Sequence, residues 1–420
     1  MSGFLLSESL RSVFNRTVRL LAVRVPVKQC DAVFRILKPL AFVHSHVKPV
    51  QVLEGASGPR LILLGEQLAT REQLESDGER MARLGKALDG APLETLAYDL
   101  RLGYEHCAMD VVLKRLLPDG VVPPVSFEVA GDLAHFNLRD DCLPFKELIG
   151  QVVRDKNPRI RTVVNKTGQI QTQFRTFPLE VIAGEPNFNV EVSESGCRFQ
   201  FDFSRVYWNS RLGSEHAKFV DLLGKNDILY DMFAGVGPFA VPAAKKGCVV
   251  LANDLNPASY EALLANRRLN KVRDKQLTAF NMDARDFVRQ HLAPHAAVQS
   301  HVVMNLPAMG PEFCDCFRGV FAGKLADGAP VVLPLIHCYG FTKESDFQAA
   351  MFARVADALG LDAMPADATC RYVREVAPDK RMLCVTFRLP RDVATAPPLS
   401  PAAKKRRTEP VGDDNDDDGE

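Results

Sequence analysis

The sequence predicts a Rossmann-like α/β domain that is preceded by smaller α+β domains and followed by a disordered tail. Residues 208–390 alternate short apolar strands with helical patterns, which is typical of βαβ units and a mainly parallel sheet. A loop with two glycines follows the first of these strands. Residues 391–420 are rich in proline and then in charge, and such a segment cannot bury enough apolar surface to fold.

The composition limits the possible classes of protein. With 420 residues the chain is long enough for two or three domains, and no apolar run approaches the ~20 residues that span a bilayer. The 52 basic and 52 acidic residues balance, so any RNA-binding surface must arise from local clustering of charge. The ten cysteines form no CxxC pair and no zinc-ligand spacing. We therefore expect a reduced, soluble, intracellular protein with no metal and no membrane partner.

Six strands are predicted for the Rossmann-like domain. They are Ile228–Tyr230, Val249–Ala252, Leu277–Phe280, His301–Met304, Val331–Ile336 and Met382–Arg388. A helix is expected after Pro257 with Asn256 as its N-cap, because asparagine caps the first turn and proline fits the first helical position.

Two parts are predicted before this domain. Residues 121–207 contain a segment in which Phe199, Phe201 and Phe203 share one face, which is typical of a half-buried antiparallel strand. Basic residues cluster in the same region, at Arg154, Lys156, Arg159, Arg161, Lys166 and Arg175. They form either a solvated face or, if the neighbouring domain handles nucleic acid, a phosphate-contacting face. Residues 1–120 are predicted to form a separate small α/β domain.

Both ends of the chain carry basic segments that bear on localisation. The arginines near the start are Arg11, Arg16, Arg19 and Arg24. With several serines and a single acid they fit a mitochondrial presequence, and equally the first helix of a domain. The basic tetrapeptide at 404–407 resembles a nuclear-localisation signal. We expect the protein in cytoplasm and nucleus, with a mitochondrial matrix pool.

The strongest local motif is the loop DMFAGVGPF at residues 231–239. Gly235 and Gly237 let the backbone turn tightly and approach a ligand. A dinucleotide site would have the fingerprint GxGxxG, in which backbone donors face a pyrophosphate. Here Ala240 replaces the third glycine and the prolines on either side of it remove two donors. The loop therefore favours a ligand without phosphates, such as S-adenosylmethionine, over NAD.

Acidic residues stand at the ends of the next two strands. Asp254, followed by Leu255, can accept hydrogen bonds from both ribose hydroxyls of an adenosine. Asp283, followed by Ala284, can accept from the adenine amino group. Alternatively, both aspartates are only turn residues and bind no ligand.

The fourth strand is followed by Asn305-Leu306-Pro307-Ala308. Methyltransferases that act on exocyclic amines have Asn/Asp-Pro-Pro there, followed by an aromatic that stacks on a flipped base. That aromatic is missing, which argues for a different acceptor geometry. Just before the domain, residues 206–216 (VYWNSRLGSEH) hold two large rings, a guanidinium, a carboxylate and an imidazole. Tyr207 either stacks on a splayed base or packs in the core, and Glu215 either takes part in chemistry or is a helix-start acid.

On these residues the chain resembles the archaeal–eukaryotic class of tRNA (guanine(37)-N1)-methyltransferases. The resemblance extends from about residue 95 to 388 and includes GDLAHFNLR at 131–139 and IAGE at 182–185. It implies a class I methyltransferase domain at 208–390, an RNA-binding linker domain at 121–207 and a tRNA-recognition domain at 1–120. It also implies S-adenosyl-L-methionine as cofactor, the tRNA anticodon loop as partner, and a monomer.

Carried over by position, the resemblance makes Glu215 the catalytic carboxylate and Arg175 the catalytic arginine, with Asn305 and Pro307 completing the catalytic set. The cofactor contacts carried over fall on His216, Asp254, Leu255, Asp283, Ala284 and Asn305. The glycine-loop motif adds Asp231, Gly235 and Gly237 to the predicted cofactor-binding residues. Tyr207 and Arg211 are predicted to hold the target nucleotide, as is Pro307. The family has a proline where this chain has Ser210, which puts the shape of that turn in doubt.

The implied reaction is methylation of a ring nitrogen. N1 of guanine carries a proton at neutral pH, so a base must remove it, and Glu215 is the candidate. Loss of that proton moves negative charge to O6, which Arg175 could stabilise. The alternatives are transfer of an aminocarboxypropyl group to a tRNA base, an NAD-dependent dehydrogenase and a non-catalytic tRNA-binding protein. A cysteine-nucleophile RNA methyltransferase is disfavoured, because no Pro-Cys pair follows a predicted strand.

Overall fold

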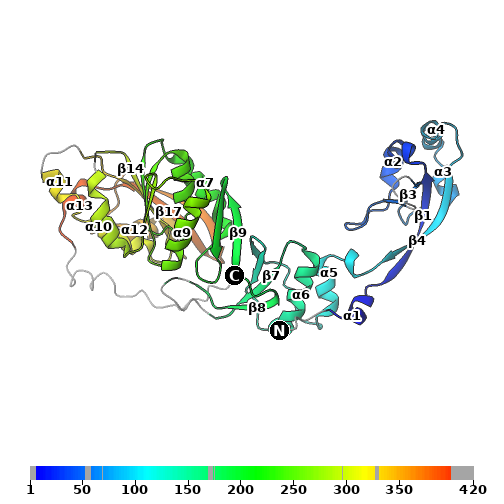
Figure 1. Ribbon diagram of the computed structural model, residues 1–420, viewed down its shortest axis with the longest axis horizontal. Helices are drawn as coiled ribbons and strands as arrows, with labels where there is room; N and C mark the ends of the chain where they lie inside the picture. Colours follow the sequence, from blue (N-terminus) through cyan, green and yellow to red (C-terminus); the bar gives the residue numbers. More distant parts are fainter. Residues whose placement is uncertain are drawn as a thin grey trace. The chain divides into compact units, whose positions relative to one another are not determined.

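The computed structural model describes residues 6–52, 58–68, 70–168, 174, 176–295, 297–326 and 331–398. The chain divides into two compact units, drawn in Figure 1. The first combines Met1–Val125 with Arg139–Pro158, and the second combines Ser126–Leu138 with Arg159–Glu420. The domain boundaries expected at residues 120, 207 and 390 stay predictions.

The first unit contains a four-stranded antiparallel sheet in the order β2-β3-β1-β4. Its strands are β1 (Arg16–Val25), β2 (Val50–Val52), β3 (Arg60–Leu63) and β4 (Glu94–Leu102). Its helices are α1 (Glu8–Ser12), α2 (Cys30–Leu37), α3 (Arg71–Glu75), α4 (Gly78–Ala87), α5 (Met109–Leu116) and α6 (Lys146–Lys156). Alternate residues of β1 enter two cores: Val23 packs with residues of α2 and α4, and Ala22 packs on the other face. Three of the four N-terminal arginines thus lie in an internal strand.

The second unit is built on a seven-stranded sheet in the order β13-β12-β11-β14-β15-β17-β16. Its strands are β11 (Ile228–Asp231), β12 (Val249–Asn253), β13 (Leu277–Phe280), β14 (Ser300–Met304), β15 (Leu335–Thr342), β16 (Thr369–Ala377) and β17 (Lys380–Arg388). β11 to β15 run parallel, and β17 pairs antiparallel with both β15 and β16. The strand order reverses at β11, which creates the switch point where open α/β sheets bind ligands.

Helices cover both faces of this sheet (Figure 1). They are α7 (Gly213–Leu222), α8 (Ala240–Lys246), α9 (Pro257–Leu269), α10 (Ala284–His291), α11 (Ala322–Ala326), α12 (Phe347–Leu359) and α13 (Arg391–Thr395). Leu229 packs in one core with residues of α7, α8 and α9, whereas Tyr230 packs in another with residues of α10 and α12. Burial on both faces explains why these strands read as continuous apolar runs.

A smaller sheet and a hairpin precede the seven-stranded sheet within the second unit. The smaller sheet contains β5 (Glu128–Ala130), β6 (Leu133–Phe136), β7 (Thr162–Lys166) and β8 (Leu179–Gly184). The hairpin contains β9 (Asn189–Glu194) and β10 (Cys197–Asp202). Phe199 and Phe201 of β10 are buried, whereas Arg198 and Gln200 are exposed and Asp202 is partly exposed. The predicted half-buried strand is therefore confirmed up to Asp202, where β10 ends, and Phe203 is buried but lies in the turn that follows.

The structure differs from the sequence prediction in four places. β17 begins at Lys380, two residues before the predicted Met382. β15 begins at Leu335 rather than at Val331 and continues to Thr342. β16 was not predicted, because an edge strand that alternates with exposed charges gives a weak apolar signal. Residues 391–395, assigned to the tail, form α13, since Val393 and Ala394 are buried in the core beneath them. Residues 399–420, with the basic tetrapeptide, lie outside the described residues.

Candidate active site

The predicted site residues gather at one edge of the seven-stranded sheet, where β11 to β14 end. Those at the strand ends or in the following loops are Asp231, Gly235, Gly237, Asp254, Leu255, Asp283, Ala284, Asn305 and Pro307. Helix α7 carries Glu215 and His216, and the segment before it carries Tyr207 and Arg211. Arg175 lies outside the described residues.

The glycine loop needs both of its glycines, for different reasons. Both have positive φ, +53° at Gly235 and +101° at Gly237, a region that residues with a Cβ rarely adopt. A Cβ at Gly237 would lie 2.7 Å from Cδ1 of Leu263 and 2.9 Å from Cγ2 of Val241, whereas one at Gly235 would meet nothing within 4 Å. Gly237 therefore allows the loop to pack closely against Leu263 of α9, whereas Gly235 borders open space where a ligand can approach.

Asp254 holds this loop to the end of β12. Its Oδ2 accepts a 2.8 Å hydrogen bond from the backbone N–H of Gly235, and its Oδ1 accepts one of 2.9 Å from the N–H of Asn256. Burial raises the pKa of Asp254, and the two backbone donors offset part of that rise. Each oxygen keeps a second lone pair that can receive a ribose hydroxyl.

Three buried acceptor oxygens in the site make no hydrogen bond of normal geometry among the described residues. Neither carboxylate oxygen of Asp231 has one, and neither does Oδ1 of Asn305. Asp231 has no exposure; burial, and then the neighbouring Asp254 carboxylate, raise its pKa well above the usual aspartate range, and a weak interaction with the backbone N–H of Phe233 offsets only a small part of that rise. Such unpaired buried groups are costly and require an explanation. A cationic ligand that also brings hydrogen-bond donors would supply one, and S-adenosylmethionine, with its sulfonium and ammonium, fits these residues.

Asp283 combines a structural role with a possible binding role. Its Oδ1 caps α10 by accepting hydrogen bonds from the N–H groups of Arg285, at 2.8 Å, and Asp286, at 3.4 Å. The cap engages one oxygen and leaves Oδ2 as the atom that could meet an adenine amino group. Leu255 is 40% exposed and Ala284 is buried.

Two buried asparagines that the sequence analysis missed tie the cofactor loops together. Asn253 donates to the carbonyl oxygens of Met232 and Met282 and accepts from the N–H of Met282. Asn266 donates to the carbonyl oxygen of Val236 at 3.0 Å and accepts from the N–H of Gln200 at 2.7 Å. Both have no exposure. A polar residue on a buried helix face, as Asn266 is on α9, was the available signal.

Glu215 is buried and engaged by two donors from the sheet. The hydroxyl of Tyr339 on β15 donates to its Oε1 at 2.6 Å. Arg371 on β16 forms a two-pronged ion pair with it, in which Nη1 reaches Oε2 at 2.9 Å and Nη2 reaches Oε1. Burial raises the pKa of Glu215, but the hydrogen bonds from these two residues, together with the charges of Arg371 and Lys218, outweigh burial and hold the pKa below its usual range. Neither donor was predicted, because both lie on strand segments that the sequence analysis did not recognise.

His216, the next residue on α7, faces the cofactor loop. Its Nδ1 lies 2.6 Å from Oε1 of Glu194, and since a carboxylate accepts, Nδ1 carries the proton and Nε2 is the nitrogen that can meet a ligand. The ring packs edge-on against Phe239 of the loop, with centroids 4.6 Å apart. Phe239 also contacts the ring of Tyr339, at 6.1 Å. This aromatic cluster joins the Glu215 environment to the glycine loop.

The predicted nucleotide-binding residues lie at the surface. Tyr207 is 46% exposed, so it is not a core residue. Nε of Arg211 forms an ion pair with Oε1 of Glu128 at 2.8 Å. Arg211 also borders a pocket of about 350 Å³, whose other lining residues are Ser126, Phe127, Glu128, His135, Phe136, Asn137 and Lys166.

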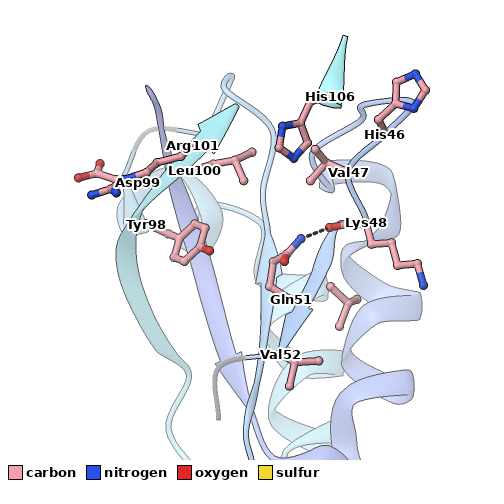
Figure 2. A pocket seen from close by; sticks show the side chains of 11 residues that line it. His46, Val47, Lys48, Gln51, Val52, Tyr98, Asp99, Leu100, Arg101 and His106 are labelled. Carbon is pink, nitrogen blue, oxygen red and sulfur yellow. Dashed lines mark hydrogen bonds between the residues drawn. The ribbon is translucent and has the colours of Figure 1, made fainter. Parts of the chain in front are cut away.

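The first unit has a pocket of its own, of about 700 Å³ (Figure 2). It is lined by His46, Val47, Lys48, Val50, Gln51, Val52, Tyr98, Asp99, Leu100, Arg101 and His106. Cationic, imidazole and phenol groups thus line this pocket together, although Tyr98 and Arg101 project from opposite faces of β4 (Figure 2). Among the described residues, no group of three or more His, Cys, Asp or Glu side chains could hold a metal ion. None of the described helices is long and apolar enough to cross a membrane.

Comparisons with known proteins agree with this geometry. The family model described as TRM5/TYW2 methyltransferase domain matches residues 190–359, and the TYW2 N-terminal domain matches residues 110–187. A tRNA (guanine(37)-N(1))-methyltransferase of Danio rerio is 42% identical, over 92% of this chain and 82% of that protein. Relatives of the same name from Phytophthora infestans, at 40% identity, and Homo sapiens, at 39%, align with 91% of this chain and with 92% and 76% of their own lengths.

Solved structures support the fold. Trm5b from Pyrococcus abyssi is 23% identical, with a TM-score of 0.58 over 88% of this chain and 99% of that one. An aTrm5 solved in complex with tRNALeu is also 23% identical, with a TM-score of 0.64 over 88% of this chain and all of that one. The extent and level of identity to the curated relatives decide the family. This chain belongs to the archaeal–eukaryotic class of tRNA (guanine(37)-N1)-methyltransferases.

Proposed function

We propose that this protein transfers a methyl group from S-adenosyl-L-methionine to N1 of guanosine 37 in tRNA, with Glu215 as the general base and Arg175 stabilising the charge on O6. The observation that carries the proposal is the buried Glu215, which is hydrogen-bonded by Arg371 and Tyr339 and stands next to His216, whose ring contacts Phe239 of the glycine loop. The names of the curated relatives give the same reaction and the same position in tRNA.

The proposed chemistry assigns each residue one task. When bound, S-adenosylmethionine supplies an electrophilic methyl group on a sulfonium. Glu215 takes the proton from N1, so that the nitrogen lone pair can attack. Asn305, whose Oδ1 has no hydrogen-bond partner within the described part of the chain, orients the reacting groups. Asp254 and His216 hold the cofactor, while Tyr207 and Pro307 position the base. Positioning of this kind supplies much of the acceleration in a displacement reaction.

Methyl transfer to defined transcripts tests the proposal. Purified protein is incubated with labelled S-adenosylmethionine and one tRNA transcript that carries guanosine or adenosine at position 37. We expect label at N1 of the guanosine and none in the adenosine transcript. Equal labelling of both transcripts, or no label at N1, would rule the proposal out.

Transfer of an aminocarboxypropyl group to a tRNA base is the alternative reaction, because the cofactor loop predicts the sulfonium donor but not which of its groups is transferred. Both reactions use the same sulfonium donor but break a different carbon–sulfur bond. Mass spectrometry of the nucleosides separates them, since one product gains a methyl group and the other a much larger zwitterionic chain. We expect only the methylated guanosine.

The first unit is proposed to contact the tRNA outside the reacting base. The pocket in Figure 2 supports this, because Lys48 and Arg101 can meet phosphates and Tyr98 can stack on a base. A fall in tRNA affinity at unchanged cofactor affinity in a Lys48→Ala/Arg101→Ala variant would agree, and unchanged tRNA affinity would contradict it.

The protein is further proposed to act as a monomer, in cytoplasm and nucleus with a mitochondrial matrix pool. β1 begins at Arg16 and is internal to its sheet, so a cleavable presequence is compatible with the fold only if it ends before that residue. Light scattering in solution tests the monomer, and fractionation of cells that express the tagged full chain tests the compartments.

A further inference from the structure

The donors around Glu215 occupy most of the lone pairs with which its carboxylate could accept a further hydrogen bond. A carboxylate oxygen has two lone pairs for hydrogen bonding. Among the described residues, Oε1 receives both the hydroxyl of Tyr339 and Nη2 of Arg371, whereas Oε2 receives only Nη1 of Arg371, at 2.9 Å. One acceptor position therefore remains, and it belongs to Oε2.

We propose that Arg371 and Tyr339 are positioning residues of the methyl-transfer reaction, which keep Glu215 ionised and present a single lone pair, on Oε2, to the N1–H of guanosine. The inference rests on the proposed role of Glu215 as the base. It adds a second arginine to the active site, on an edge strand far from Arg175 in the sequence.

Burial makes these donors necessary. The Glu215 side chain is 5% exposed, and burial alone favours the neutral acid, which cannot accept a proton. A two-pronged guanidinium compensates both the charge and the hydrogen bonding. Burial raises the pKa of the Tyr339 hydroxyl well above its usual range, so this group stays protonated and can act only as the donor toward the carboxylate.

Other titratable groups around the base do not replace this pair. Lys218, one turn further along α7, acts on Glu215 through its charge and lowers its pKa less than Arg371 and Tyr339 do. Cys384 on β17 interacts with Arg371 and with Glu215, but burial raises the pKa of its thiol to about 12, so it is neutral at physiological pH. Arg371 is the one of these groups that is both charged and in contact with both carboxylate oxygens.

The proton balance of the step follows. Oε2 takes the N1 proton, the nitrogen lone pair forms the bond to the methyl carbon, and the carbon–sulfur bond breaks to leave a neutral thioether. Glu215 is then a neutral acid beside Arg371. The Arg371 side chain is 45% exposed, so water can reach the pair, and the guanidinium favours loss of the proton to solvent. Arg371 thereby also resets the base for the next turnover.

The test is the pH dependence of methyl transfer in single turnovers, where the rate reports chemistry rather than product release. The wild-type rate falls on the acid side as Glu215 takes up a proton. In Arg371→Gln, burial acts without compensation, and the acid limb moves to higher pH by about 1–3 units, the range expected when an opposite charge is lost. In Arg371→Lys, which keeps the charge but not the two-pronged contact, we expect the acid limb to lie between those of the wild type and Arg371→Gln. Tyr339→Phe is expected to shift the acid limb in the same direction by a smaller amount.

Controls separate a positioning role from a structural one. Arg374→Gln removes a charge from the same strand, at the position paired with Met382, and is expected to keep the wild-type profile. A loss of rate in Arg371→Gln that is equal at every pH would show a merely structural role and overturn the inference. Failure of the proposed function itself is recognised separately: wild-type protein would then place no methyl at N1, or Glu215→Gln would retain full activity.

Discussion

The backbone N–H of Gly235 donates a 2.8 Å hydrogen bond to Oδ2 of Asp254. This bond joins the glycine loop after β11 to the end of β12, and the N–H of Asn256 holds the second oxygen at 2.9 Å. Both oxygens are thus oriented before a ligand binds. Orientation of this kind reduces the free energy that binding must spend on ordering the site.

Asp254→Asn is expected to weaken S-adenosylmethionine binding by about ten- to a hundredfold. A hydrogen bond to a charged group contributes ~1.5–3 kcal/mol, and the new amide nitrogen would oppose a backbone donor. Isothermal titration calorimetry measures the change. Asp274→Asn, whose side chain is 87% exposed, is the matched control, and an equal loss in both variants would contradict a specific role for Asp254.

Asp231→Asn is expected to move stability and binding in opposite directions. Because the pKa of Asp231 is raised in the folded state, ionising it costs folding free energy, and the cofactor-free protein loses stability as the pH rises through that raised pKa. The asparagine removes this cost, so the melting temperature at neutral pH rises, by roughly 2–4 °C for each kcal/mol relieved. Affinity for the cationic cofactor falls, because the buried negative charge is gone. Thermal melts and titrations measure the two effects, and a fall in both would refute this account.

The wild-type cofactor affinity should depend on pH for the same reason. Binding of a cation favours the ionised form of Asp231, so affinity increases as the pH rises through the raised pKa and levels off above it. Asp231→Asn should remove most of this dependence. Titrations of S-adenosylmethionine binding across a pH series test this prediction. If Asp231→Asn keeps the wild-type pH dependence of the affinity, another group must be responsible for it.

Alanine at the two loop glycines should have different effects. Gly237→Ala places a Cβ 2.7 Å from Leu263 and should destabilise the protein by about 1–3 kcal/mol through overpacking, in addition to the strain of positive φ. Gly235→Ala meets nothing within 4 Å, so we expect a smaller loss of stability but weaker cofactor binding. Denaturant unfolding and calorimetry distinguish the two. Equal losses of stability would show that φ, rather than packing, dominates at both sites.

Asn266→Ala should destabilise the glycine loop, because it removes the hydrogen bond to the carbonyl oxygen of Val236. It leaves the carbonyl oxygen of Val236 and the N–H of Gln200 without their partner, at a cost of ~1–3 kcal/mol for each buried group that stays unsatisfied. Lower stability and weaker cofactor binding are both expected. Asn270→Ala, one turn along α9 and more exposed, is the control and should affect cofactor binding less. If both variants bind the cofactor normally, the loop does not depend on this support.

The parallel core of the fold followed from the sequence with good accuracy. The predicted strands that became β11, β12, β13 and β14 differ from those in the structure by at most one residue at each end, and Asn256 caps α9 as expected. These elements are specified locally, by apolar runs buried on both faces and by capping residues. The loop glycines were predictable for the same reason, because positive φ excludes most other residues.

The environment of Glu215 was not predictable in this way. Its partners Tyr339 and Arg371 lie 124 and 156 residues away in the sequence. Tyr339 lies in the part of β15 beyond the predicted end of that strand, and Arg371 lies on β16, an edge strand that was not predicted. Pairing between distant side chains depends on the antiparallel return of β17 and β16, which no local pattern encodes. The sequence by itself determined the reaction class and the cofactor loop, since motif and backbone conformation are local. Only the tertiary structure decided how the base is held ionised, because burial and ion pairing exist only when the chain has folded.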